Sequence, residues 1–179
     1  MLRAIELSRK CTSEAGKVSP KVGAVVARDG VILGEAYRGE LQPGEHAEYT
    51  LLEKKLPDAQ LAGATLFTTL EPCTVRSDNK LPCADRIIDR RFAKVFMGVI
   101  DPNKSVKGEG QLRLRDRGIQ VALFDSDLAD TIEELNRDFI RDIRKLSKAG
   151  EFSSRETQTS DELGMLDPQL AGLYEQGFA

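Results

Sequence analysis

Residues 22–37 carry the sequence VGAVVARDGVILGEAY, and this stretch decides the fold. Two apolar runs flank the pair formed by Asp29 and Gly30. An Asp-Gly pair between such runs is typical of a tight β-hairpin, because both residues tolerate the positive φ angles that the turn requires. We therefore expect two antiparallel strands to start the sheet.

Segments typical of helices and strands alternate around this hairpin. Further strands are expected over residues 64–69, 94–100 and 119–124, and helices over residues 2–13, 46–55, 83–91 and 110–117. The final helix is predicted from Leu128 to Leu146, where apolar residues recur every three or four positions, with Ser126 or Asp127 as its N-terminal cap. This order predicts an α/β fold in which helices cover both faces of a mixed sheet.

The chain is expected to form one domain over residues 1–149, followed by a tail over residues 150–179. A length of 179 residues is too short for two ordinary domains. Residues 151–160 are rich in Ser, Thr and Glu, as linkers are, whereas the end of the chain regains apolar residues. The tail is therefore interpreted as either flexible or docked on this domain or on a sister subunit.

Composition limits the location and the partners of the protein. No apolar run approaches the ~18 residues of a membrane span, so no membrane partner is expected. The N-terminal segment lacks the pattern of a signal peptide, and three cysteines cannot all pair, which predicts a reduced, cytoplasmic protein. Residues 76–117 contain eleven Lys and Arg residues but six Asp and Glu residues, and this excess of positive charge favours an anionic partner.

A candidate metal site combines His46, the single histidine of the chain, with two Pro-Cys units that contain Cys73 and Cys83. One imidazole and two thiolates suit Zn²⁺, which prefers tetrahedral nitrogen and sulfur ligation. Three protein ligands leave a fourth position for water, which zinc activates at neutral pH. Glu48 is then expected to act on that water as general base and acid. Cys11 is interpreted as a buried thiol of the first helix and not as a fourth ligand.

These residues resemble the cytidine-deaminase-like superfamily, whose signature is His-x-Glu followed by Pro-Cys and a second Cys. Further segments resemble the deaminase domain of bacterial riboflavin biosynthesis, namely Val22-Gly-Ala-Val-Val, Thr69-Leu-Glu-Pro-Cys, Leu81-Pro-Cys-Ala-Asp, Asp101-Pro-Asn and Leu135-Asn-Arg-Asp-Phe. The resemblance implies a three-layer α/β/α fold with a central mixed five-stranded sheet. It also implies that His46 and both cysteines lie at helix N-termini, and that Glu71 is a structural part of the turn before Cys73.

The activity implied by this resemblance is that of a zinc-dependent deaminase, a hydrolase acting on the C–N bonds of cyclic amidines. Its expected substrate is a small molecule, a pyrimidine-type and phosphorylated nucleotide or a riboflavin-pathway-like intermediate. Relatives in this superfamily often form homo-oligomers, so a homo-oligomer is expected here as well.

Three departures from the riboflavin deaminases fall on positions that resemble their substrate contacts. This chain has Ser19-Pro20-Lys21 before the first strand, Arg38 after the second, and a His-free stretch between Cys73 and Cys83. The loop that starts at Asp101 offers backbone N–H groups and lysines to an anion. The candidate substrate contacts are Ser19, Lys21, Arg38, Arg76, Lys80, Asp101, Asn103 and Lys104.

Two alternatives remain open on the sequence. The basic middle of the chain also suits a deaminase that acts on tRNA or on bases in single-stranded nucleic acid, although aromatic residues make up only 6% of the chain. The second alternative is a non-catalytic interaction module that zinc stabilises, for which Glu48 would have no purpose.

Overall fold

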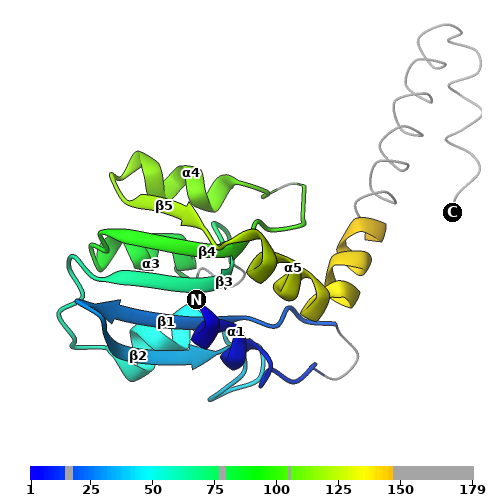
Figure 1. The fold of residues 1–179 in the computed structure, drawn as a ribbon, viewed down its shortest axis with the longest axis horizontal. Coiled ribbons are helices and arrows are strands. Elements are labelled where there is room, and N and C mark those ends of the chain that lie inside the picture. Colours follow the sequence, from blue (N-terminus) through cyan, green and yellow to red (C-terminus); the bar gives the residue numbers. More distant parts are fainter. Residues whose placement is uncertain (15–17, 77–79, 105, 147–179) are drawn as a thin grey trace, which may run out of the picture. The chain divides into compact units, whose positions relative to one another are not determined.

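The structure is a computed structural model, and it describes residues 1–14, 18–76, 80–104 and 106–146. Its centre is a five-stranded mixed sheet with the strand order β2-β1-β3-β4-β5 (Figure 1). The strands are β1 (Gly23–Arg28), β2 (Val31–Tyr37), β3 (Thr65–Leu70), β4 (Lys94–Val99) and β5 (Gln120–Leu123). Strand β1 pairs antiparallel with β2 and β3, whereas β3, β4 and β5 run parallel. The mixed five-stranded sheet is as expected.

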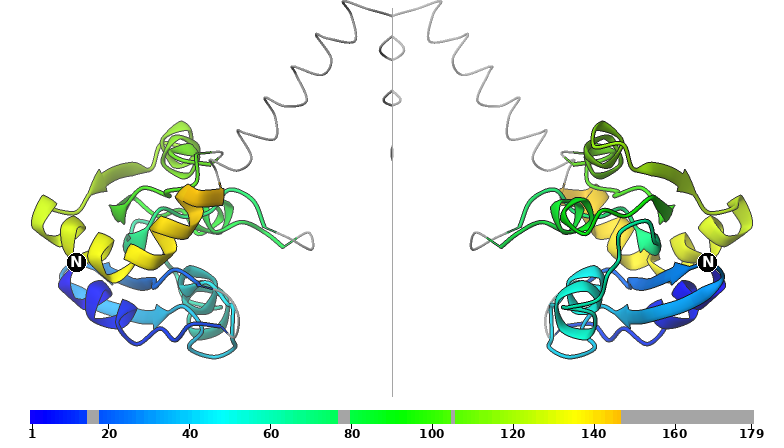
Figure 2. Two further views of the ribbon diagram at one scale, coloured as in Figure 1. Left: turned by 90° about the vertical axis from the view of Figure 1, so that its right-hand side faces the viewer. Right: turned by 90° about the vertical axis from the view of Figure 1, so that its left-hand side faces the viewer.

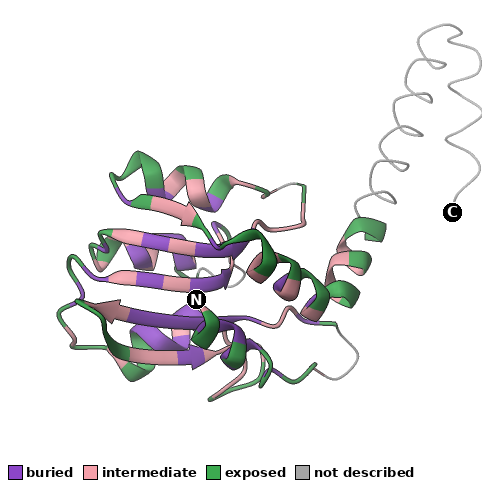
Figure 3. Ribbon diagram, in the orientation of Figure 1, coloured by how far each residue is buried: buried purple, intermediate pink, exposed green. Residues whose placement is uncertain are grey.

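The hairpin that opens the sheet confirms the interpretation of residues 22–37. Asp29 and Gly30 connect β1 to β2 with φ angles of 51° and 78°. Strand β2 is the edge of the sheet, and its first three residues are exposed, whereas four consecutive residues of β1 are buried (Figure 3).

Helices cover both faces of the sheet, which confirms the three-layer architecture. They are α1 (Leu2–Ser8), α2 (Ala47–Tyr49), the π-helical segment η1 (Thr50–Lys55), α3 (Cys83–Asp89), α4 (Glu109–Asp116) and α5 (Ser126–Leu135). Helices α1 and α5 lie on one face, and α2, α3 and α4 lie on the other (Figure 2). The second face carries the metal donors described below.

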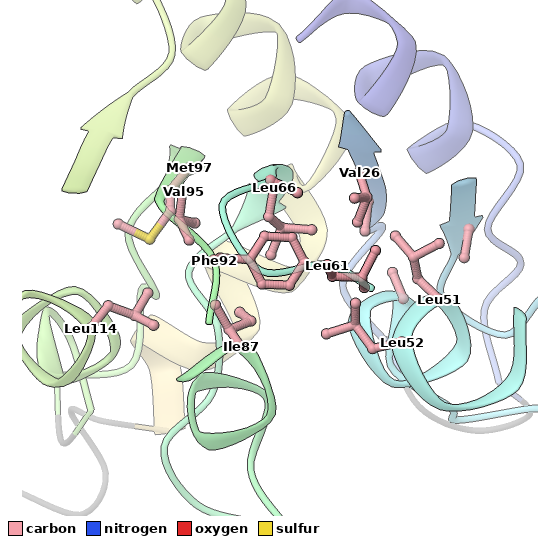
Figure 4. Close-up of a cluster of buried hydrophobic side chains, with 14 of the residues drawn as sticks. Val26, Leu51, Leu52, Leu61, Leu66, Ile87, Phe92, Val95, Met97 and Leu114 are labelled. Carbon is pink, nitrogen blue, oxygen red and sulfur yellow. The ribbon is translucent and has the colours of Figure 1, made fainter. Parts of the chain in front are cut away.

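Two apolar cores follow from the alternation of side chains along the strands. On the face of α3 and α4, the fully buried side chains of Leu66, Val95 and Ile87 belong to one apolar cluster (Figure 4). On the face of α1 and α5, the rings of Phe67 and Phe96 stack with centroids 5.0 Å apart. Each fully buried aliphatic side chain stabilises the fold by roughly 1.5–3 kcal/mol, so the sheet is held from both sides.

Two predicted helices differ from the structure. Helix α1 ends at Ser8 and not at residue 13. The final helix has Asp125 as its N-cap, without a side-chain hydrogen bond, so the prediction of Ser126 or Asp127 as a cap was wrong. It is also interrupted at Asn136, because this residue leaves helical geometry (φ −105°, ψ 14°) and its side chain binds the backbone of Lys21. Helical structure resumes over residues 137–146.

The chain divides into two compact units, Met1–Asp142 and Ile143–Ala179. The second unit is described over residues 143–146, which are helical. The predicted tail over residues 150–179, and its boundary with the domain over residues 1–149, lie outside the described residues. Among the described helices, none has the length and apolar character needed to cross a membrane.

Candidate metal centre and active site

The three predicted metal donors converge next to the loop that follows β3, the central strand of the sheet. His46 is the N-cap of α2, Cys83 is the first residue of α3, and Cys73 lies in the loop that follows β3. Their donor atoms all lie within 4.8 Å of one another. The expectation of helix N-termini therefore holds for His46 and Cys83, whereas Cys73 lies in a loop.

The spacing of these donors fits a tetrahedral zinc ion. The Nδ1 atom of His46 is 3.6 Å from the Sγ atom of Cys73 and 3.5 Å from that of Cys83. An ion about 2.3 Å from sulfur and about 2.0 Å from nitrogen, with tetrahedral angles, places sulfur and nitrogen roughly 3.5–3.6 Å apart. The residues present therefore fit the metal by both chemistry and distance.

The two thiols influence each other's ionisation. The pKa of Cys73 is lowered to about 4, first because the Cys83 thiol donates a hydrogen bond to its sulfur, and also because His46 lies beside it. The pKa of Cys83 is raised, because it donates that hydrogen bond and because it is buried. The backbone N–H of Cys83 also donates to the sulfur of Cys73 over 3.4 Å. A divalent cation is the group that would hold both sulfurs as thiolates.

Glu48 is a buried carboxylate beside the donors. Its residue is 3% exposed, and its Oε1 atom accepts a hydrogen bond of 2.8 Å from the hydroxyl of Thr68 on β3. Burial raises the pKa of Glu48. A small cavity of about 100 Å³ is lined by Glu48 together with His46 and Cys73. The carboxylate therefore faces the space beside the metal donors without belonging to the donor cluster itself.

Further residues complete the walls of this cavity. They are Pro20, Val22, Arg38, Ala47, Leu70, Glu71, Asp101 and Phe139. Burial also raises the pKa of Asp101. Two of the predicted substrate contacts, Arg38 and Asp101, thus lie against the same space as the metal donors.

A second, larger cleft of about 680 Å³ is also lined by His46. Its cationic lining residues are Arg38, Lys54, Arg76, Lys80 and Arg86. Two carboxylates, Glu14 and Glu45, also line it. Because Arg38 and His46 line both spaces, the cationic cleft and the small cavity meet at these two residues.

Arg38 is fixed on one side and presents a donor on the other. Its Nη2 atom forms an ion pair of 2.6 Å with Glu14, whose carboxylate also accepts a hydrogen bond from the hydroxyl of Ser19. Its Nε atom is buried without a hydrogen-bond partner in the part of the chain that the structure describes. A buried N–H group without a partner costs roughly 1–3 kcal/mol, which favours a ligand acceptor at this position.

Other predicted contacts have different surroundings. The hydroxyl of Ser19 donates to Glu14, and the backbone N–H of Lys21 donates to Asn136. Neither Ser19 nor Lys21 is among the described residues that line the small cavity or the cleft. Asn103 and Lys104 are likewise outside both linings. The backbone N–H of Asn103 instead donates to the carboxylate of Asp101 over 2.9 Å.

Glu71 binds backbone N–H groups of the loop that starts at Asp101, which we expected to bind an anion. Its buried carboxylate accepts hydrogen bonds of 3.0 Å from the backbone N–H groups of Asp101, Gly108 and Gln111. The start of α4 packs so closely against the turn before Cys73 that a Cβ atom on Gly110 would lie 2.3 Å from the carbonyl oxygen of Pro72. Glu71 therefore joins the turn before Cys73 to the loop that ends in α4, which agrees with the structural role inferred for it.

Three residues of the site were not singled out from the sequence as site residues. Thr68 and Asn136 are ordinary polar residues in strand and helix patterns, and their partners, Glu48 and Lys21, are remote in sequence. Phe139 belongs to the apolar stripe of the last helix, which the periodicity assigned to core packing. For Phe139, the resemblance of residues 135–139 to a deaminase helix was the available signal.

A three-layer fold with His-Cys-Cys donors and an adjacent buried carboxylate defines the class of zinc-dependent deaminases. Residues 1–99 match the family model described as the cytidine and deoxycytidylate deaminase zinc-binding region. The chain belongs to this family.

Several relatives come from riboflavin biosynthesis. The chain is 36% identical over 124 residues to the diaminohydroxyphosphoribosylamino-pyrimidine deaminase of Buchnera aphidicola, covering 69% of this chain and 80% of that protein. It is 34% identical over 145 residues to the riboflavin biosynthesis protein RibD of Escherichia coli, covering 80% of this chain and 37% of that protein. The chain thus spans about a third of the length of such longer relatives.

A solved structure shows the same fold. It is a diaminohydroxyphosphoribosylaminopyrimidine deaminase/5-amino-6-(5-phosphoribosylamino)uracil reductase from Thermotoga maritima, with a TM-score of 0.69 and 38% sequence identity. The match covers 81% of this chain and 40% of that protein.

Proposed function

We propose that this chain is a hydrolytic deaminase, which removes an exocyclic amine from a phosphorylated, pyrimidine-type nucleotide or a related biosynthetic intermediate. The observation that carries this proposal is the buried carboxylate of Glu48, which faces the same cavity as the donors His46 and Cys73. A site that used zinc for folding alone would need no buried carboxylate beside it other than one that holds a loop, as Glu71 does.

Zinc held by His46, Cys73 and Cys83 would supply a Lewis acid that activates water. Glu48 takes a proton from the attacking water while the water oxygen bonds to the ring carbon that bears the amine, and it passes this proton to the adjacent ring nitrogen. Glu48 then takes the remaining proton of the added hydroxyl and delivers it to the amine, the C–N bond breaks, and ammonia leaves. The hydroxyl of Thr68 holds the Oε1 atom of Glu48 through these transfers.

The cationic cleft supports a phosphorylated substrate. Arg38, Arg76 and Lys80 line it within reach of the space next to His46, and Arg76 has a buried Nη1 atom without a partner among the described residues. A ring in the small cavity would leave its ribosyl phosphate in this cleft, where guanidinium groups bind phosphate by charge-assisted hydrogen bonds. The names of the relatives likewise specify a phosphoribosylamino-pyrimidine.

Ammonia release tests the proposal. The purified, zinc-loaded protein is incubated with diaminopyrimidinone ribosyl phosphate, with cytosine and adenine nucleotides and nucleosides, and with single-stranded RNA and DNA. We expect turnover of a phosphorylated pyrimidine-type compound and a loss of roughly 10²–10⁴-fold in kcat for Glu48→Gln, because the amide cannot transfer the proton. Glu133→Gln, at an exposed position of α5, is the matched control and is expected to keep wild-type activity.

Three results would contradict this proposal. Equal activity of Glu48→Gln and wild type excludes the proton-transfer role. Turnover confined to RNA or DNA favours the nucleic-acid alternative, and a zinc-bound protein that deaminates nothing in the panel favours the interaction module. The cytoplasmic location and the homo-oligomeric state stay predictions, which cell fractionation and light scattering test.

A further inference from the structure

Asn136, at the break in the last helix, binds the segment that precedes β1. Asn136 is 4% exposed, and its Oδ1 atom accepts a hydrogen bond of 2.7 Å from the backbone N–H of Lys21. Its Nδ2 atom donates to the carbonyl oxygens of Lys21 and Ile132 over 3.2 and 3.1 Å. The side-chain amide thus pairs with both backbone groups of a residue 115 positions away, as a neighbouring strand would.

The segment that Asn136 holds is a wall of the cavity beside the metal donors. Pro20 and Val22, on either side of Lys21, both line this cavity. The carbonyl oxygen of Val22 accepts a hydrogen bond of 2.8 Å from the backbone N–H of Arg38, which lines the same space. A shift of Lys21 would therefore move the wall and the backbone of Arg38 together.

The helical segment that follows the break contributes Phe139 to this cavity. Phe139 lies three residues after Asn136, in the helical segment that resumes at residue 137, and it lines the cavity with Glu48 and Cys73. The other apolar walls are aliphatic, so Phe139 is the apolar aromatic side chain among the described lining residues, apart from the imidazole of His46. An aromatic face on one side of such a space suits a flat heterocycle, because stacking is insensitive to the pattern of ring substituents.

We infer that Phe139 contacts the heterocycle of the substrate as a stacking wall, and that Asn136 is the positioning residue that fixes this wall and the segment around Lys21. The inference rests on the proposed function and deepens it, because it assigns part of the substrate recognition to the last helix. It requires a substrate with a planar ring and predicts no contribution of Phe139 to metal binding.

Fluorescence at position 139 tests the wall independently of turnover. The chain contains no tryptophan, so Phe139→Trp introduces a single indole, and Ile140→Trp is the matched control one residue away. Both zinc-loaded variants are titrated with cytidine monophosphate and with diaminopyrimidinone ribosyl phosphate, and with ribose 5-phosphate as a ligand without a ring. We expect the ring-bearing ligands to quench the indole of Phe139→Trp and ribose 5-phosphate to leave it unchanged. The indole of Ile140→Trp should respond to none of the three.

Comparison with the ammonia assay separates the two ideas. If the fluorescence of Phe139→Trp is silent with a compound that the wild-type protein deaminates, the wall is excluded and the deaminase function stands. If this variant responds but the wild type releases no ammonia, the wall stands and the proposed function fails. Silence in both assays contradicts both. Where turnover is found, Phe139→Leu is expected to raise KM by roughly 5- to 150-fold at unchanged zinc content.

A kinetic comparison tests the positioning role of Asn136. Asn136→Ala removes the bridge and is expected to raise KM by roughly 10- to 100-fold, with a smaller change in kcat and one zinc per chain retained. Ile132→Val, in the same helix and fully buried, is the control: it lowers Tm but leaves KM unchanged. If Asn136→Ala lowers Tm and keeps the wild-type KM, its role is structural and the positioning inference is overturned.

Discussion

Two buried glutamates line the cavity beside the metal donors, and their hydrogen bonds differ. Glu71 accepts hydrogen bonds from three backbone N–H groups, so both of its carboxylate oxygens are hydrogen-bonded. Glu48 accepts a hydrogen bond from the hydroxyl of Thr68 on Oε1. Both residues line the same cavity, so their hydrogen bonds distinguish them. A carboxylate bound by one hydroxyl is suited to proton transfer, whereas one bound on both oxygens by backbone donors is suited to holding a loop.

Replacing Glu71 tests this division at the scale of one residue. Glu71→Gln puts an NH₂ group against backbone N–H donors, so at least one buried donor loses its acceptor. We expect the free energy of unfolding to fall by about 1–3 kcal/mol, measured by urea denaturation of the zinc-saturated proteins. Glu109→Gln, an exposed neighbour at the start of α4, should have little effect. Equal midpoints for the two variants would refute the structural role of Glu71.

At the scale of elements, the helix that starts after His46 changes character along its length. Residues 46–55 were expected to form one helix, and they do so as α2 followed by the π-helical η1, in which the N–H of Leu56 binds the carbonyl oxygen of Leu51. The end of η1 is capped by the guanidinium of Arg90, which donates to the carbonyl oxygens of Leu52, Leu56 and Pro57. This arrangement satisfies carbonyl groups that a helix end leaves without partners.

Removal of this cap should loosen η1. Arg90→Ala eliminates charge-assisted hydrogen bonds to three carbonyl groups, and we expect a loss of at least about 1.5–3 kcal/mol in the free energy of unfolding, with Tm as the readout. Arg117→Ala, an exposed arginine after α4, serves as the comparison and should leave Tm nearly unchanged. A Tm for Arg90→Ala within error of that of Arg117→Ala would show that η1 does not depend on the cap.

The elements differ in how far local sequence determines them. The hairpin was predictable, because the φ preferences of Asp29 and Gly30 act within the turn itself. The donors His46, Cys73 and Cys83 were predictable from a motif that combines residue type and spacing. The break at Asn136 was not, because a partner 115 residues away outweighs a continuous helical pattern. The π geometry of η1 was also missed, since local periodicity does not distinguish it from an α-helix.

At the scale of the whole molecule, zinc would join parts of the chain that the sheet already brings together. Its donors come from the start of α2, the loop after β3 and the start of α3. A ligand that binds the folded chain alone stabilises it by mass action, by about 2.7 kcal/mol at a free concentration one hundred times Kd. The metal should therefore act on global stability as well as on the reaction.

Metal removal gives the corresponding prediction. Treatment with a chelator should lower Tm, and restoring zinc should recover it, because binding to the folded state is lost and regained. Differential scanning calorimetry of the wild type is compared with that of His46→Ala, whose Tm should respond much less to either treatment. A wild-type Tm that is independent of zinc would argue against the metal centre.

The separation of the three donors along the chain has a consequence for the order of events when the protein folds. His46 and Cys73 lie 27 positions apart, and Cys73 and Cys83 lie 10 apart. We expect them to meet only after β3 has paired with its neighbours and the helices on that face have docked, which would place the complete donor set late in folding. Interactions absent from the transition state slow unfolding without speeding folding. The ion should thus lower the unfolding rate and prolong the lifetime of the native state, while the folding rate stays governed by formation of the sheet.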